Sequence, residues 1–122
     1  MKINNDVPGL MSYDELCVLA KIADSLPKDK SSTIIEVGSF CGRSSCAFLA
    51  NYDGAFYSID PFGFNMFDEL LNIMVGSKEG CNNRPISDLF DENTQEYSHR
   101  ITKVVAKSPP PSWAVMGRRY FH

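Results

Sequence analysis

Apolar positions along the first half of this chain change between two spacings, and the changes predict a helix followed by a strand–helix–strand unit. A capping pattern that starts at Ser12 opens a run of apolar residues at helical spacing, which stops before Pro27. Short runs rich in β-branched and aromatic residues follow at 34–37 and 55–59, and residues 46–50 between them are typical of a helix. The 34–37 run has the composition of a strand that is buried on both faces of a parallel sheet.

The rest of the chain repeats this alternation. Residues 85–97 place apolar side chains on one helical face, and residues 101–106 alternate as a third strand does. Residues 62–84 carry a further helical pattern, which fits either a lid over a binding site or a surface helix that covers a sheet edge. Together the repeats predict an α/β fold, a Rossmann-like parallel sheet with flanking helices, in a single domain of residues 1–122.

Composition narrows the classes of function. The 122 residues are 43% hydrophobic, which suffices for one modest core, and the net charge of -3 argues against a nucleic-acid partner. No stretch has the pattern of a signal peptide or of a membrane span, so we expect a cytoplasmic protein without a membrane partner. No metal is expected, because the cysteines lack the spacing of a zinc site; they are Cys17, Cys41, Cys46 and Cys81.

The candidate chemistry lies in the turn after the first strand, where Glu36 precedes Gly38 and Gly42. A P-loop needs another glycine spacing and a lysine, whereas Arg43 follows the second glycine here and is expected to be solvated. A dinucleotide fingerprint needs a glycine where Phe40 stands. The turn therefore favours a smaller cofactor whose carboxylate or amine meets the start of the helix, and S-adenosylmethionine fits that description.

These residues resemble the first motif of the class I S-adenosylmethionine-dependent methyltransferases, acid-x-Gly-x-x-x-Gly. The second strand of that family ends in an acid, as the second predicted strand does here at Asp60. The resemblance covers residues 10–62, and it is greatest to the branch that contains small-molecule O-methyltransferases. The cofactor-binding residues that the resemblance implies are Glu36, Gly38, Ser39, Gly42, Ser44 and Asp60.

The family assigns roles to these positions. The two glycines would let the backbone pass close to the methionine portion, and Asp60 would accept hydrogen bonds from both ribose hydroxyls. Glu36 would orient the amino group of the cofactor, and free amides near Ser44 and Ser45 would favour its carboxylate. Taken alone, the glycines also fit a tight turn, and an aspartate before a proline also fits a turn initiator.

The resemblance also sets expectations for the whole assembly. The family's sheet has seven strands in the order 3-2-1-4-5-7-6, and this chain is expected to supply the first three, as a truncated version of that fold. Acceptor-binding and catalytic groups lie beyond the fourth strand in the family, so no catalytic residue is named and enzymatic activity stays open. The favoured function is methyl transfer from S-adenosylmethionine to a small molecule, with this chain as the cofactor-binding half.

Three alternatives remain open at this point. The first is a non-catalytic cofactor-binding or interaction module that needs a partner chain, or a second copy of this chain, over the exposed edge of the sheet. The second is a nicotinamide or flavin domain, which Phe40 disfavours. The third is a structural remnant without a ligand.

Overall fold

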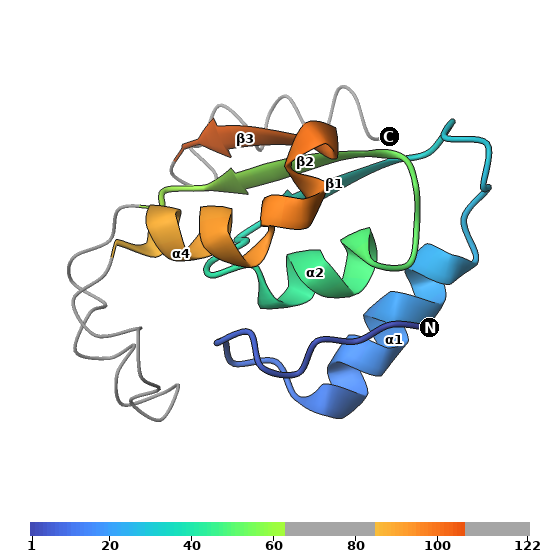
Figure 1. The fold of residues 1–122 in the computed structure, drawn as a ribbon, viewed down its shortest axis with the longest axis horizontal. Helices are drawn as coiled ribbons and strands as arrows, with labels where there is room; N and C mark the ends of the chain where they lie inside the picture. Colours follow the sequence, from blue (N-terminus) through green and yellow to red (C-terminus); the bar gives the residue numbers. More distant parts are fainter. Residues whose placement is uncertain (63–84, 107–122) are drawn as a thin grey trace, which may run out of the picture.

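Helices and strands alternate in the computed structural model, which describes residues 1–62 and 85–106 (Figure 1). In chain order the elements are α1 (Tyr13–Asp24), β1 (Thr33–Val37), α2 (Arg43–Leu49), β2 (Ala55–Asp60), α4 (Ile86–Asn93), the 3₁₀ helix η2 (Gln95–Arg100) and β3 (Ile101–Val105). The segment considered as a lid lies outside the described residues, except for its first residue. None of the helices described has the length and apolar character needed to cross a bilayer.

The three strands form one parallel sheet in the order β1-β2-β3. In this register Ile35 lies beside Tyr57, and Tyr57 lies beside Thr102. The crossover helices α2 and α4 lie on the same side of the sheet, and α1 packs against α2 (Figure 1). The predicted α/β fold with a Rossmann-like parallel sheet is confirmed.

Two buried clusters join the sheet to its helices. One surrounds Phe56 on β2 and includes Ala23, Leu49 and Tyr52. The other surrounds Phe90 on α4 and holds its neighbours Cys41, Phe62, Ile86 and Leu89. Fully burying one large apolar side chain stabilises a fold by about 1.5 to 3 kcal/mol, so these clusters supply much of what keeps the helices on the sheet.

Helix α1 begins as its sequence predicts. The Ser12 hydroxyl accepts a hydrogen bond from the Glu15 amide at 3.2 Å, and the Glu15 carboxylate accepts one from the Ser12 amide at 3.0 Å. This capping box satisfies two amides that would otherwise lack partners in the first turn. The stripe that follows is buried at Leu16, Ala20 and Ala23, so the helix packs through its apolar face.

The prediction that the first strand is buried on both faces is wrong. Ile35 is 56% exposed and Val37 is 54% exposed, and Tyr57 on the neighbouring strand is 40% exposed. The helices described cover the opposite face, so alternate residues of β1 point away from them. Among the described strands β1 pairs with β2 alone, which leaves its other edge without a described strand.

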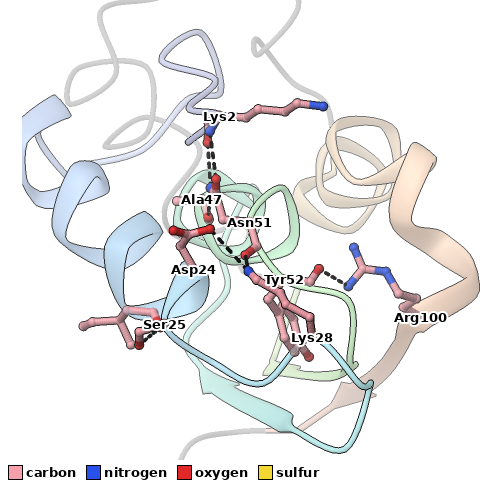
Figure 2. A network of polar contacts seen from close by, with 9 residues as sticks. Lys2, Asp24, Ser25, Lys28, Ala47, Asn51, Tyr52 and Arg100 are labelled. Atoms are coloured by element: carbon pink, nitrogen blue, oxygen red, sulfur yellow. Dashed lines mark hydrogen bonds and ion pairs between the residues drawn. The ribbon is translucent and has the colours of Figure 1, made fainter.

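A polar network ties the start of the chain to the end of α2 (Figure 2). The Asn51 side chain accepts from the Lys2 amide at 2.8 Å and donates to the Lys2 carbonyl at 2.7 Å and to the Ala47 carbonyl at 2.8 Å. Lys28 adds a bond to the Asn51 carbonyl at 3.3 Å and pairs with Asp24. Residues distant in sequence are therefore fixed side by side at this end of the helix.

Candidate functional site

A cavity of about 370 Å³ opens at the carboxyl ends of β1 and β2. Parallel α/β sheets place their ligands at this edge, and ligand cavities are typically about 300 to 1,000 Å³. Its walls come from the turn after β1, the first turn of α2, the end of β2 and the segment before α1. The lining residues are Gly9, Leu10, Met11, Gly38, Ser39, Phe40, Arg43, Ser44 and Asp60.

The structure brings most of the sequence-predicted site residues to this cavity. Those that line it are Gly38, Ser39, Ser44 and Asp60. Glu36 and Gly42 do not line it. Glu36 is half-buried, and its carboxylate accepts hydrogen bonds from the Ser44 hydroxyl at 2.6 Å and from the buried Ser45 hydroxyl. Glu36 therefore orders the Ser44 side chain, and a hydroxyl that donates in this way can still accept a bond from a ligand.

The two glycines of the turn differ in their surroundings, although both have positive φ. Gly38 has φ +88°, and a Cβ added there would meet no atom within 4 Å. Gly42 has φ +93°, and a Cβ there would lie 3.1 Å from the Thr94 methyl group and 3.3 Å from the Phe90 ring. Gly38 thus leaves open space at the cavity, whereas Gly42 permits the close packing of α2 against α4.

Asp60 organises the backbone around the cavity. Its carboxylate accepts from the Phe40 amide at 3.0 Å and from the Phe62 amide at 2.8 Å. Both phenylalanines have positive φ, +54° and +55°, which is uncommon for bulky residues and strained. Asp60 therefore makes the turn contact that its position before Pro61 suggested. Each carboxylate oxygen has a further acceptor site, so this contact leaves capacity for the hydroxyls of a ligand.

Ser39 contributes mainly through its backbone position. Its side chain is 2% exposed, and its hydroxyl accepts a hydrogen bond from the buried Ser58 hydroxyl on β2. That bond joins the turn after β1 to the neighbouring strand. The Gly38 amide reinforces the same junction by donating to the Ile59 carbonyl at 2.8 Å. The floor of the cavity is consequently fixed by bonds that do not involve a ligand.

The expectation that Arg43 is solvated is wrong. Its guanidinium donates to the Met11 carbonyl at 2.6 Å, the Asn5 carbonyl at 2.8 Å, the Val7 carbonyl at 2.9 Å and the Asn5 side-chain oxygen at 2.6 Å. Its partners lie 32 to 38 positions earlier in the chain, so no local pattern around Arg43 points to them. We call residues 2–11 the N-terminal strap; three of its residues line the cavity.

The Cys46 thiol is not activated as a nucleophile. Burial, together with the nearby charges of Glu36 and Glu96, raises the pKa of the Cys46 thiol to about 12, and its sulfur donates to the Asn93 carbonyl at 3.3 Å. Cys41 is also buried and forms no disulfide, whereas Cys17 on α1 is half-buried. Within residues 1–62 and 85–106, no three His, Cys, Asp or Glu side chains gather closely enough to hold a metal ion.

No model of a known protein family matches this chain, and no curated protein sequence matches it. What the structure establishes is a small α/β domain with a three-stranded parallel sheet and alternating helices.

Proposed function

We propose that this chain binds S-adenosylmethionine in the cavity at the carboxyl ends of β1 and β2, as the cofactor-binding half of a methyltransferase that acts on a small molecule. The observation that carries the proposal is the pairing of Gly38 and Asp60 on one cavity. Gly38 leaves room for a ligand to approach the backbone. Asp60 supplies two fixed acceptor oxygens, which suit the two hydroxyls of a ribose.

Phe40 favours this cofactor over a dinucleotide. It lines the cavity at the position where a dinucleotide site has a glycine, and its backbone is held by Asp60. A side chain at that position restricts the approach of a pyrophosphate to the turn. S-adenosylmethionine has a single nucleoside and an amino-acid tail and carries no pyrophosphate, so it avoids this restriction.

The residues of this chain explain binding better than they explain catalysis. When bound, S-adenosylmethionine supplies an electrophilic methyl group, and transfer to oxygen needs an acceptor held in line and a group that removes its proton. Asp60 is the carboxylate that lines the cavity, and it is already bonded to two backbone amides. The acceptor and the base are therefore expected from residues beyond those described.

The exposed face of the sheet favours a second candidate, a cofactor-binding module that a partner chain or a second copy completes. Ile35, Val37 and Tyr57 leave a row of apolar surface on β1 and β2, next to the edge of β1 that has no described strand. Both candidates predict cofactor binding. They differ in turnover, which the module would lack when purified alone.

Calorimetric titration of the 122-residue chain with S-adenosylmethionine and S-adenosylhomocysteine tests the proposal. We expect saturable binding that Asp60→Asn weakens about tenfold or more, because a charge-assisted hydrogen bond is lost. Gly38→Asn should weaken it as well, since asparagine tolerates positive φ and places a side chain in the cavity.

Asp53→Asn is the matched control, because it removes the same charge at an exposed position at the other end of the sheet. It should change the affinity by less than about twofold. An absence of binding by the folded wild-type chain, or equal losses in Asp60→Asn and Asp53→Asn, would contradict the proposal. Displacement of S-adenosylhomocysteine by a nicotinamide dinucleotide would favour the dinucleotide alternative.

A further inference from the structure

The N-terminal strap runs along α2 in the opposite direction to the helix and is tied at both ends. Asn51, which follows the C-cap of α2, holds Lys2 through a pair of hydrogen bonds. Arg43, the first residue of α2, holds the strap from Asn5 to Met11. Figure 1 shows the dark-blue start of the chain passing beside α2 from its carboxyl end toward its amino end.

The strap contacts Arg43 both through hydrogen bonds to the guanidinium and through close packing on its aliphatic stem. The guanidinium spreads its donors over three peptide carbonyls and one side-chain oxygen of the strap. Gly9 packs directly on the stem of the same side chain, where an added Cβ would lie 2.9 Å from the Arg43 Cδ. The strap therefore wraps around one arginine, and the absence of a side chain at Gly9 allows it.

The position of the strap gives this contact a consequence for the cavity. Leu10 and Met11 line the cavity, yet Leu10 is 67% exposed, so little besides the strap's own anchors holds this wall in place. Val7, whose carbonyl also accepts a hydrogen bond from Arg43, is 3% exposed, and Pro8 beside it is buried as well. These two residues dock the strap on the fold, whereas Leu10 is exposed and Met11 is half-buried. A segment with little buried apolar surface is the kind that opens locally, so the wall formed by Leu10 and Met11 depends on the bonds that hold the strap.

We propose that Arg43 is a positioning residue that latches the N-terminal strap, so that Leu10 and Met11 form a wall of the cavity only while the latch is closed. Arg43 also lines the cavity itself, and the latch adds an effect through these two residues. A ligand that contacts the wall is held more tightly by the closed state, and by linkage it keeps the strap closed. This last statement rests on the proposed function, whereas the latch itself does not.

Alkylation of a buried thiol in the strap tests the latch without any ligand. In a Val7→Cys background, iodoacetamide labelling at residue 7 requires the strap to open, and peptide mass spectrometry separates that site from the native cysteines. We expect Arg43→Gln and Gly9→Ala each to raise the labelling rate about tenfold or more, because charged hydrogen bonds or close packing are lost. Arg43→Lys should give an intermediate rate, since lysine keeps the charge without the planar set of donors.

Arg100→Gln is the matched control. Arg100 also donates to three backbone carbonyls, those of Leu49, Tyr52 and Gly54, and none of these residues belongs to the strap. Its replacement should leave the labelling rate at residue 7 within about twofold of the background. Equal rates in the Arg43 and Arg100 variants would overturn the latch, because Arg43 would then contribute general stability only.

A second measurement separates the latch from the proposed function. Calorimetry with S-adenosylhomocysteine should show weaker binding to Arg43→Gln than to Arg100→Gln, and saturating ligand should slow labelling in the Val7→Cys background. If the folded wild-type chain binds no S-adenosylhomocysteine, the proposed function fails and the ligand-free labelling still decides the latch. If ligand binds with equal affinity to both arginine variants, Arg43 is not a positioning residue.

Discussion

The two ends of the parallel sheet are built differently, although each carries a depression of similar size. The volumes are about 370 Å³ at the carboxyl end and about 390 Å³ at the amino end. At the carboxyl end, the Asp60 carboxylate holds the backbone amides of Phe40 and Phe62, both of which have positive φ. At the amino end, Arg100 donates to three backbone carbonyls, and Gly54 packs against the backbone of Ser32, in the loop before β1.

This difference shows that volume alone does not mark a site. The carboxyl end keeps acceptor capacity, open space at Gly38 and strained backbone, which are features that accumulate where a protein binds ligands. At the amino end, the guanidinium of Arg100 is already bonded to the backbone of the protein itself. If this difference in geometry matters for stability, substitutions at the two ends should change the free energy of unfolding by different amounts.

The largest effect is expected from a matched pair of glycine substitutions. A Cβ at Gly54 would lie 2.0 Å from the Ser32 carbonyl oxygen and 2.7 Å from the Tyr52 ring, so backbone must move in Gly54→Ala. We expect it to lower the free energy of unfolding by about 3 kcal/mol or more. A Cβ at Gly38 would meet no atom within 4 Å, so Gly38→Ala should lower the free energy of unfolding by about 1 to 2 kcal/mol, from the positive φ alone. Urea titration measures both, and equal losses would contradict the contrast.

The next largest effect is a difference in stability between variants of Arg100 and Arg43. Arg100→Gln should lower the free energy of unfolding by about 2 to 3 kcal/mol, because its partly buried carbonyl partners lose charged donors. Arg43→Gln should lower the free energy of unfolding by less than about half that amount, since the strap can detach while the sheet stays folded. Urea titration followed by circular dichroism reports the global transition. A larger loss in Arg43→Gln would show that the strap belongs to the cooperative core.

The smallest effect near neutral pH is the pH dependence of stability that comes from Cys46 on α2 and Tyr97 on η2. Burial, followed by the charge of Glu36, raises the pKa of Cys46 to about 12, and burial likewise raises the pKa of Tyr97 to about 12. The folded chain keeps both protons at a pH where the unfolded chain releases them, so their stabilisation is complete at pH 7 and is lost as the pH rises from about 9 toward 12. Urea midpoints should therefore change little between pH 7 and 8 and fall above pH 9.

Cys46→Ala is the control for that titration. It removes one of the groups whose pKa is raised in the folded chain, so the stability of the variant should fall less steeply between pH 9 and 11 than that of the wild-type chain, whatever its stability at neutral pH. An identical slope would mean that Cys46 contributes nothing to the alkaline loss.

Elements governed by local contacts were predictable from the sequence. The capping box at Ser12 joins residues three positions apart, and the β-branched and aromatic runs gave the strands with their connecting helix. The position of Gly38 and Asp60 at one cavity was predictable because parallel strands bring their carboxyl ends to one edge.

Features that depend on distant partners were not predictable. The positive φ of Phe40 depends on a carboxylate that strand pairing brings within 3.0 Å, and no residue preference indicates it. The role of Arg43 depends on Asn5, Val7 and Met11. The exposure of Ile35 depends on which face of the sheet the helices cover, and a run of β-branched residues does not specify that.

The strap also has a consequence for the order of events during synthesis. Lys2 bonds to a residue 49 positions later, and Met11 bonds to one 32 positions later. At about 5 to 20 residues per second, a ribosome needs seconds to add the intervening chain, and the first residues have no docking site until α2 has formed. This wall of the cavity is therefore synthesised before the helix on which it docks, and it cannot take its place until α2 has formed.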